Sequence, residues 1–274
     1  MVLRAYAKIN LTLDIVGKRE DGYHLIDSVF QSVGLFDVLD IKKSDETRVH
    51  CGEIEQKDNI AFTAAKEFFK FTKIGGGAEI NIEKHIPLLS GLGGGSADAA
   101  AVIVSLDRLY KTELTKKELV KIALKCGADV PFFIYGGTAR VRGIGEDIKP
   151  LPDIKGYYAV LVKSGEKKST KDMYQRLDSM PQQNSNTQSF LDARNEAKFR
   201  FLGNAFLALA GDKDIITALG SENPMGVSVS GSGPTHFAIF SSEAAAEKAA
   251  ENLKNSGYKP IVAPFVSRTI EEID

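Results

Sequence analysis

A glycine-rich turn between a strand pattern and a helix pattern constrains the fold of this chain more than any other stretch. Residues 87–101 read PLLSGLGGGSADAAA, with an alternating pattern before them and an alanine-rich helical run from about Ser96. Glycine allows positive φ and close approach to the main chain, so several backbone amides can converge on an anion before a helix amino end. The turn therefore predicts a polyphosphate site, and the alternative is a tight packing turn between helix and sheet.

The residues around the turn exclude two common phosphate-binding motifs. A Walker P-loop needs Gly-Lys followed by Ser or Thr, which this turn lacks. A dinucleotide-binding unit would have Gly or Ala in place of Ser96 and a strand after the helix. Instead, Thr115 and Glu118 form a capping-box pattern that predicts a second helix, which Gly127 can end.

The first strand pattern places a lysine and an asparagine on one face. From Leu3 to Ile15 every odd position is apolar, and the even positions include Lys8 and Asn10. The alternation predicts a long half-buried strand with these two side chains next to each other, their Cα atoms about 6.5 to 7 Å apart. On the residues alone, this polar face is more simply interpreted as exposed to water.

Composition indicates a globular protein and excludes several classes. A chain of 274 residues can bury a sizeable core, and we expect two lobes, residues 1–150 and 151–274. The net charge of −1 gives no basis for nucleic-acid or membrane binding, and neither a membrane span nor a signal peptide is found, so we expect a cytoplasmic protein. Cys51 and Cys126 are expected to be reduced thiols, and the histidines lack the spacing of a metal site.

The rest of the chain is predicted to mix helices and strands. Asp58 is expected to cap the first helix, Ser169 begins a second capping-box pattern, and Met180 to Ser189 is interpreted as a mobile loop or linker. Asp129 lies just outside a helix end, where an acid is usually a turn residue. The predicted helices cover about 59–73, 96–110, 115–127, 169–177, 195–209, 213–219 and 243–254. The predicted strands include 3–15, 25–33, 38–42, 78–84, 136–142, 157–163, 226–230, 235–240 and a closing strand at 262–266.

Three stretches in register resemble the GHMP kinases, the superfamily of galactose, homoserine, mevalonate and phosphomevalonate kinases. They are A-K-I-N at 7–10, P-x-x-x-G-L-G-G-G-S at 87–96 and S-G-S-G-P-T at 230–235. Within the superfamily the chain is similar to the enzymes that phosphorylate a cytidylated methylerythritol for isoprenoid synthesis, with D-G-Y-H at 21–24 as the discriminating element. The resemblance implies a two-lobed α+β fold, each lobe a mixed or antiparallel sheet with packed helices, and an active site in the cleft between the lobes.

The resemblance implies a kinase that uses ATP and Mg²⁺ to phosphorylate an alcohol, and we expect a monomer or a weak homodimer. Asp129 would orient or deprotonate the acceptor hydroxyl, and Lys8 beside it would neutralise charge on the γ-phosphoryl group. Ser96 would bind a phosphate oxygen or Mg²⁺. The residues implied for ATP are Asn59, Ile60, Lys84, Pro87, Ser90, Gly91, Leu92, Gly93, Gly94, Gly95 and Ser96.

For the acceptor, the resemblance implies a slot for a pyrimidine ring. Tyr23 and Tyr174 would stack on its two faces, and His24 would read its edge. Asn10 would bind the polyol end, and the 230–235 loop would form a second cluster of amides opposite the glycine turn. The residues implied for the acceptor are Asn10, Tyr23, His24, Asp129, Thr170, Tyr174, Gly231 and Ser232.

Two departures and two alternatives accompany the resemblance. Leu89 and Ser90 stand where these enzymes often have Gly or Ala, and Tyr174 stands where some have Phe. One alternative keeps the fold but takes a small alcohol, which would leave the pyrimidine slot without a purpose. The other is a nucleotide-binding regulator without turnover, which would not need both Lys8 and Asp129.

Overall fold

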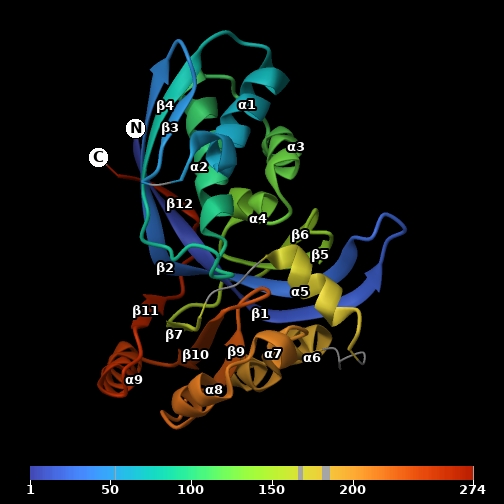
Figure 1. Cartoon of the computed structure of the whole chain (residues 1–274), viewed down its shortest axis with the longest axis vertical. Coiled ribbons are helices and arrows are strands. Elements are labelled where there is room, and N and C mark those ends of the chain that lie inside the picture. Colours follow the sequence, from blue (N-terminus) through green and yellow to red (C-terminus); the bar gives the residue numbers. More distant parts are fainter. Residues whose placement is uncertain (53, 166–168, 181–185, 274) are drawn as a thin grey trace.

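The computed structural model describes residues 1–52, 54–165, 169–180 and 186–273, and two long strands link its two parts (Figure 1). These strands, β1 (Val2–Lys18) and β2 (His24–Ser44), pair antiparallel, and their hairpin tip projects from one side. They belong to an eight-stranded sheet of order β12-β1-β2-β4-β3, with β5 beside β2, β6 beside β5 and β8 beside β1. The other strands are β3 (Arg48–His50), β4 (Gly77–Glu83), β5 (Thr138–Gly143), β6 (Asp147–Pro150), β8 (Gly203–Asn204) and β12 (Ile270–Ile273).

Four helices pack on this sheet and form the first core: α1 (Ile60–Thr72), α2 (Gly94–Tyr110), α3 (Lys116–Cys126) and α4 (Val130–Tyr135). The capping box of α3 is confirmed, because Thr115 accepts a hydrogen bond from the Glu118 amide and the Glu118 side chain bonds back to Thr115. The predicted cap of α1 is wrong by one residue. Asp58 ends a 3₁₀ turn, η1 (Gln56–Asp58), and Asn59 Oδ1 accepts from the Ala61 amide at 2.9 Å instead.

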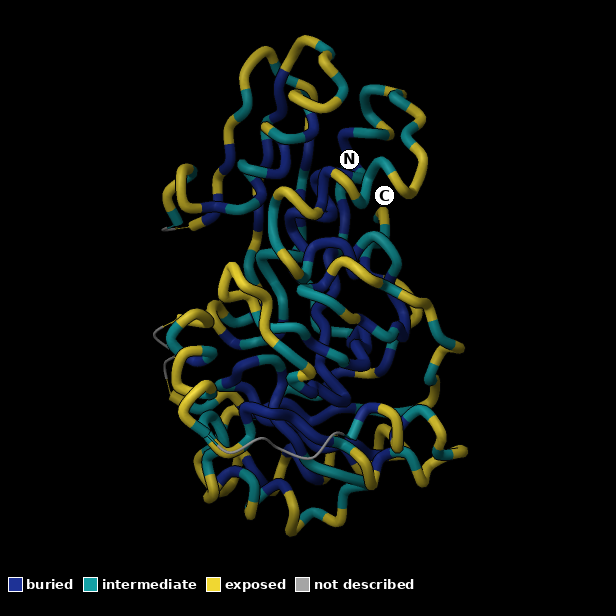
Figure 2. Tube along the Cα trace, turned by 90° about the vertical axis from the view of Figure 1, so that its right-hand side faces the viewer, coloured by how far each residue is buried: buried dark blue, intermediate teal, exposed yellow. Residues whose placement is uncertain are grey.

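A second, four-stranded antiparallel sheet forms the other part, in the order β11-β7-β10-β9. Its strands are β11 (Pro260–Pro264), β7 (Tyr158–Lys163), β10 (Thr235–Phe240) and β9 (Gly226–Val229). One face packs on α8 (Lys213–Gly220) and α9 (Glu243–Asn255), through residues such as Val160, Ile215 and Leu253. The other face, with Leu161 and Phe237, packs on β1 and β2. The molecule is therefore α+β with two sheets, as predicted, and buried residues run through the middle of both parts (Figure 2).

The apolar positions of β1 serve both cores in turn. Leu3, Ala5 and Leu13 belong to the first core, whereas Ala7, Ile9 and Leu11 belong to the core between the two sheets. The changes coincide with irregularities in the pairing with β2, after residue 6 and again between residues 10 and 12. Because such irregularities bend and twist a strand, both of its faces can be buried. The simpler interpretation of the polar face as exposed to water is therefore wrong: Lys8 is 2% exposed and Asn10 is fully buried.

The predicted helix at 195–209 is replaced by three short elements. They are a 3₁₀ helix η2 (Asn195–Phe201), β8 and α7 (Leu207–Ala210). The reason is a set of long-range hydrogen bonds: the Asn204 side-chain amide donates to the carbonyls of Val229 and Gly231, and β8 pairs with β1. These bonds hold the segment extended where a helix would have continued.

The remaining segments are residues 169–192 and the end of the chain. Helix α5 (Thr170–Leu177) is capped by Ser169, whose hydroxyl accepts from the Asp172 amide, and α6 (Thr187–Asp192) includes the end of the predicted polar loop. The centre of that loop, 181–185, lies outside the described residues. The closing strand begins two residues earlier than predicted, as β11, and is followed by β12, which returns to pair with β1. The division into lobes at residue 150 stays a prediction.

Two further observations concern the whole chain. Cys51 is buried and Cys126 is half-buried, and both are free thiols, as predicted. In the described ranges, every helix is too short or too polar to cross a membrane.

Candidate active site

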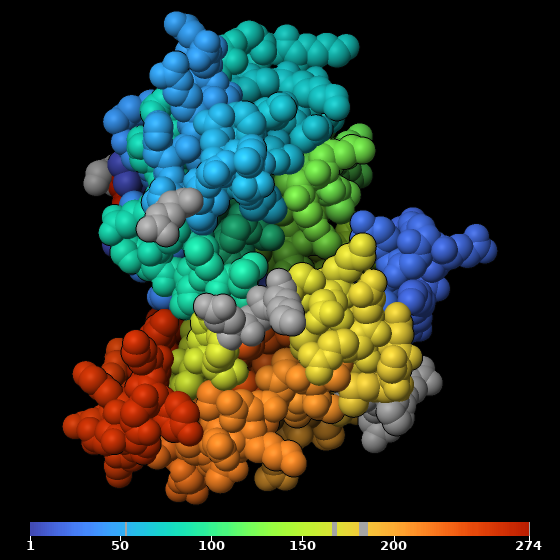
Figure 3. Space-filling model, viewed as in Figure 1, coloured from blue at the N-terminus to red at the C-terminus, as the bar shows by residue number. Residues whose placement is uncertain are grey.

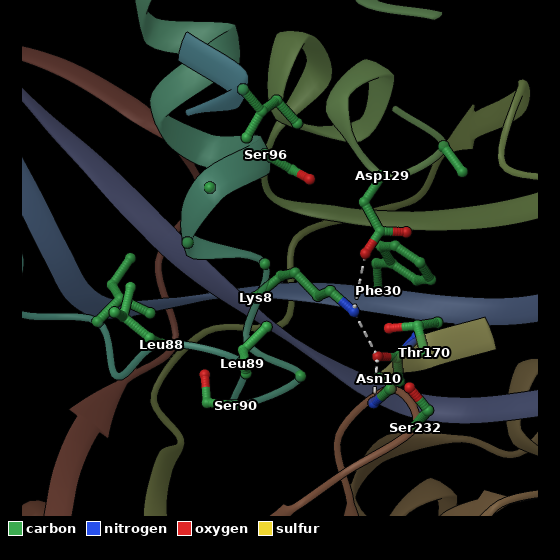
Figure 4. Close-up of a pocket in the computed structure, with 18 of the residues that line it drawn as sticks. Lys8, Asn10, Phe30, Leu88, Leu89, Ser90, Ser96, Asp129, Thr170 and Ser232 are labelled. Atoms are coloured by element: carbon green, nitrogen blue, oxygen red, sulfur yellow. Dashed lines mark hydrogen bonds and ion pairs between the residues drawn. The ribbon is translucent and has the colours of Figure 1, made fainter. Parts of the chain in front are cut away.

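A cavity of about 430 Å³ lies between the amino end of α2, the middle of β1 and the loop before β10 (Figure 4). Side chains from both parts of the molecule line it. The lining residues predicted from the sequence are Lys8, Asn10, Ile60, Lys84, Pro87, Ser90, Gly91, Gly93, Gly94, Gly95, Ser96, Asp129, Thr170, Tyr174, Gly231 and Ser232. The structure therefore gathers in one cavity most of the side chains that were separated by up to 224 residues in the chain (Lys8 to Ser232).

The glycine turn forms one wall, and its backbone requires glycine at two positions. Gly91 and Gly93 have φ of 82° and 75°, and a Cβ on Gly91 would lie 2.2 Å from the Ser230 carbonyl oxygen. The turn is fixed to β1 because the Lys8 amide donates to the Leu92 carbonyl at 2.9 Å. The first helical hydrogen bond is donated by Ala97, so the helix does not use the amides of residues 94–96. These amides are at the positive end of α2, where an anion binds favourably.

Lys8 is a buried cation that lines the cavity. Its Nζ lies 3.4 Å from Asp129 Oδ2, 2.7 Å from Asn10 Oδ1 and 4.5 Å from the centre of the Phe30 ring (Figure 4). The Lys8 side chain is 3% exposed and that of Asp129 is 36% exposed, so the pair has one dry and one open end. A buried ammonium needs such partners, because its desolvation is costly when it is unpaired.

Local structure determines the direction of the Asp129 side chain. The chain leaves α3 at Gly127, the Val130 amide donates to the Gly127 carbonyl, and Asp129 becomes the amino cap of α4. Its side chain makes no capping hydrogen bond. The carboxylate is therefore available to the cavity, and the usual interpretation of such an acid as a turn residue does not account for it.

The side chain of Asn10 is already hydrogen-bonded to other residues of the protein. Its Oδ1 accepts from Lys8 Nζ and from the Gly231 amide at 2.8 Å, and its Nδ2 donates to Ser28 Oγ at 3.1 Å. Its predicted role in binding the polyol stays a prediction, and the bonds that the structure shows connect it to Lys8, Ser28 and Gly231. The Gly231 amide is likewise already bonded, and the 230–235 loop lies against the glycine turn, where Ser230 Oγ donates to the Gly91 carbonyl at 2.9 Å. The predicted placement of this loop opposite the turn is wrong.

Lys84 also lines the cavity and belongs to a buried charge network. Its Nζ is 2.5 Å from Asp37 and 2.7 Å from Asp98, in the first turns of α2. Asp37 also accepts from the amides of His85 and Ile86. Burial raises the pKa of Asp98 to about 7, despite the opposing attraction of Lys84. The network fixes the Lys84 ammonium beside Gly94, whose Cβ would lie 3.3 Å from Nζ.

Four predicted residues do not line the cavity. Asn59 caps α1, and Leu92 is 1% exposed with its carbonyl bonded to Lys8. Tyr23 lies at the hairpin tip and is 61% exposed. The His24 ring stacks on Tyr174, with centroids 4.8 Å apart and planes at 28°, so it covers one of the Tyr174 faces that was predicted for a pyrimidine.

The sequence did not indicate the apolar residues that line the cavity. They are Leu13, Ile26, Phe30, Ile86, Leu88, Leu89, Ala128 and Ile144. Three of them, Leu88, Leu89 and Ala128, lie inside the recognised motifs. Their place in a motif could have indicated that they line the cavity. Phe30 is paired with Asn10 only through the β1–β2 register, which the sequence does not specify.

The cavity offers few protein oxygens for a metal ion. Within the described ranges, no group of three or more His, Cys, Asp and Glu side chains is arranged to hold one. Ser96 points its hydroxyl into the same space as the Asp129 carboxylate (Figure 4). Such a sparse site fits Mg²⁺ that arrives with a nucleotide, because phosphates and water supply most of its ligands.

Comparisons with known proteins identify the same superfamily in both parts of the chain. Residues 59–137 match the GHMP kinases N terminal domain, and residues 204–259 match the GHMP kinases C terminal domain. The 4-diphosphocytidyl-2-C-methyl-D-erythritol kinase of Clostridium acetobutylicum is 38% identical over 98% of this chain and 100% of its own length. That of Clostridium beijerinckii is 37% identical over the same shares.

Solved structures agree. A crystal structure of 4-(cytidine 5'-diphospho)-2C-methyl-D-erythritol kinase is 31% identical, with a TM-score of 0.78 over 97% of this chain and 99% of that one. Homoserine kinase from Cytophaga hutchinsonii has the same TM-score at 21% identity, over 100% of this chain and 97% of that one. The second likeness concerns the fold alone.

Proposed function

The chain belongs to the 4-diphosphocytidyl-2-C-methyl-D-erythritol kinases, a family of the GHMP kinases, and on that premise we propose how its own residues carry out the reaction. The enzyme transfers the γ-phosphoryl group of ATP to the 2-hydroxyl of its acceptor, in the non-mevalonate route to isoprenoid precursors. The observation that carries the proposal is the Lys8–Asp129 pair, which lies in the same cavity as the glycine turn.

The ATP phosphates bind the amides at the amino end of α2, with the γ-phosphoryl group toward Lys8. Two features support this orientation: the unused amides of residues 94–96 and the buried ammonium of Lys8 both line the cavity. The adenine end then extends toward Ile60 and Lys84. Lys8 stabilises the negative charge that spreads over the phosphoryl oxygens during transfer, and its burial strengthens this effect.

Asp129 receives the proton of the acceptor hydroxyl or holds that hydroxyl in line with the γ-phosphorus. The partial exposure of the Asp129 carboxylate supports this role, because the group is paired with Lys8 on one side and accessible on the other. Asn10 keeps Lys8 in place through Oδ1 and links this arrangement to the loop at Gly231.

Ser96 would hold Mg²⁺ together with the nucleotide phosphates. When bound, the ion neutralises phosphate charge during transfer. The Ser96 hydroxyl at the helix amino end is the protein group that we assign to this site, because it faces the cavity beside Asp129.

The cytidine end of the acceptor binds near the hairpin tip and α5. Thr170 and Tyr174 line that side of the cavity, and His24 lies on Tyr174. We keep the sandwich between Tyr23 and Tyr174 as a proposal. We also propose that the enzyme acts in the cytoplasm as a monomer or weak homodimer without a nucleic-acid partner.

A substrate panel tests the proposed function. The protein is incubated with ATP and Mg²⁺ and with cytidylated methylerythritol, free methylerythritol, mevalonate or homoserine, and products are identified by mass. We expect one added phosphoryl group on the cytidylated acceptor and none on the others. Phosphorylation of an uncytidylated alcohol at a comparable rate would contradict the assignment of the acceptor.

A further inference from the structure

One carboxylate joins the two segments that surround the cytidine side of the cavity. Asp178 follows the last residue of α5, and its oxygens lie 2.6 Å from His24 Nε2 and 2.7 Å from Lys18 Nζ. Lys18 ends β1 and His24 begins β2, so Asp178 holds both strands of the hairpin tip. Figure 3 shows the tip, in blue, beside α5, in yellow.

The contact with Asp178 has a consequence for the protons of the His24 ring. A carboxylate oxygen accepts hydrogen bonds, so His24 Nε2 must carry the donated proton. In a neutral imidazole the other nitrogen, Nδ1, is then an acceptor. In the part of the chain that the structure describes, Nδ1 has no hydrogen-bond partner. The His24 ring therefore has one accepting nitrogen without a partner among the described residues.

The orientation of the His24 ring is fixed, and so is the position of its proton. Stacking on Tyr174 sets the plane of the imidazole, and Tyr174 is itself held edge-on against Phe206, with centroids 4.8 Å apart. The His24 side chain is 9% exposed. A ring that is held by stacking on one side and by Asp178 at Nε2 presents Nδ1 in one direction.

We propose that Asp178 is a positioning residue that selects a cytidine over a uridine acceptor, by holding His24 in the form whose Nδ1 accepts. The proposal rests on the function proposed above. Cytosine carries an exocyclic amine, which donates, where uracil carries a carbonyl, which accepts. An accepting Nδ1 is satisfied by the amine and leaves the uracil carbonyl facing a lone pair, and a site built for one hydrogen-bonding group rejects an analogue that cannot make the bond.

Replacement of the carboxylate by an amide tests the inference. In Asp178→Asn the side chain has nearly the same shape, and with its oxygen accepting from Lys18 its NH₂ group is turned to His24 and donates to Nε2, which favours the form with a proton on Nδ1. We expect kcat/KM for the cytidine acceptor relative to the uridine acceptor to fall about tenfold or more, mainly through KM, while the KM for ATP is unchanged. Asp178→Glu, which restores a carboxylate, should retain most of the wild-type preference.

Lys18→Met is the matched control, because it removes the other partner of the same carboxylate and leaves the contact with His24. It should preserve the cytidine preference, even if acceptor binding weakens. A purely structural role for Asp178 predicts instead that Lys18→Met and Asp178→Asn weaken both acceptors equally. An unchanged ratio in Asp178→Asn would overturn the inference.

Nitrogen NMR of ¹⁵N-histidine-labelled protein gives a readout that does not depend on activity. The His24 signals are assigned by their loss in His24→Gln. We expect a protonated Nε2 and an unprotonated Nδ1 in the wild type at neutral pH, and a shift toward protonated Nδ1 in Asp178→Asn. A protonated Nδ1 in the wild type would overturn the inference, whereas failure of the wild type to phosphorylate any cytidylated acceptor would count against the proposed function alone.

Discussion

Lys8 is a charged residue on a strand that is buried on both faces, and its partners come from distant parts of the chain. Asn10 is two positions away, Phe30 belongs to β2 and Asp129 lies before α4. A lysine so enclosed keeps its charge close to its partners with little screening by water. This arrangement suits a cation that has to act on a phosphoryl group.

Lys8→Met should therefore reduce kcat by about 10²- to 10⁴-fold, because the transferring phosphoryl group loses its adjacent positive charge. The methionine side chain fills similar space, so the melting temperature should change little. Steady-state kinetics at saturating ATP and acceptor measure the effect. Lys42→Met is a matched control, since Lys42 is also a strand lysine paired with an aspartate, 2.7 Å from Asp40, but is 65% exposed and outside the cavity. A kcat within threefold of that control would contradict the role of Lys8.

Site residues that lie inside a motif could be predicted from the sequence. Contacts with residues far away in the chain could not. Lys8, Ser96 and Asp129 lie together in the cavity as the motifs implied. The sequence did not indicate that the side-chain oxygen of Asn10 already accepts a hydrogen bond from the amide of Gly231, 221 residues away. No local pattern contains that contact, so the sequence alone assigned a ligand role to a side chain that is already bonded.

At the scale of elements, α2 and its preceding turn are the part that we propose binds the ATP phosphates. Gly94 is the first residue of the helix, and a Cβ there would lie 2.9 Å from Ile86 Cγ2 and 3.3 Å from Lys84 Nζ. Both neighbours line the cavity. A side chain at this position would have to displace them.

Gly94→Ala should weaken ATP binding by about 1 to 3 kcal/mol, the usual cost of overpacking, which is roughly 5- to 150-fold in Kd. Acceptor binding should change much less, because Thr170 and Tyr174 lie on another element. Isothermal titration with each ligand measures both. Gly75→Ala is the control, since its Cβ would meet nothing within 4 Å and its φ is not positive. Equal loss of both ligands in Gly94→Ala would show that the turn has a structural role only.

Elements with their own end signals were predicted closely. Thr115 and Ser169 both cap helices, and Gly127 ends α3. The prediction of a helix at 195–209 was wrong because the conformation of this segment depends on the hydrogen bonds of Asn204 and on pairing with β1. Helical periodicity in the sequence does not indicate such bonds. Caps are local interactions, whereas strand pairing is set by tertiary contacts.

At the scale of the molecule, the long strands β1 and β2 connect the two cores, and β12 brings the end of the chain back to β1. The sequence predicted two sheets and packed helices, but it did not indicate β12 or the exchange of cores along β1. Both depend on strand order and register, which alternation of apolar residues does not determine.

Stability of the second sheet should depend on pH through His236. This residue is fully buried in β10, and its Nε2 accepts from the Asp212 amide at 2.8 Å. Burial lowers the pKa of His236 from its ordinary value of 6.5, so the unfolded chain binds the proton more tightly. The contribution of the neutral ring is present above pH 6.5 and is lost as the pH falls toward the lower pKa of the folded state.

Urea unfolding between pH 7.5 and 5 measures this effect. The free energy of unfolding of the wild type should fall over that range, and His236→Gln, which can still accept from Asp212, should lose less. His50→Gln serves as control, because His50 is 59% exposed, and it should retain the wild-type loss. An identical pH dependence in His236→Gln and wild type would exclude His236 as the cause.

The most direct test of the account is a single-turnover measurement with Asp129→Asn. Wild type and variant are saturated with ATP, Mg²⁺ and the cytidylated acceptor, and phosphoryl transfer is followed by rapid quench, with both dissociation constants measured separately. The account predicts that transfer slows by about 10²- to 10⁴-fold while both ligands still bind, because Asp129 acts on the acceptor hydroxyl only as it reacts. Transfer at a rate within threefold of the wild type would contradict the assignment of the Lys8–Asp129 pair as the catalytic centre.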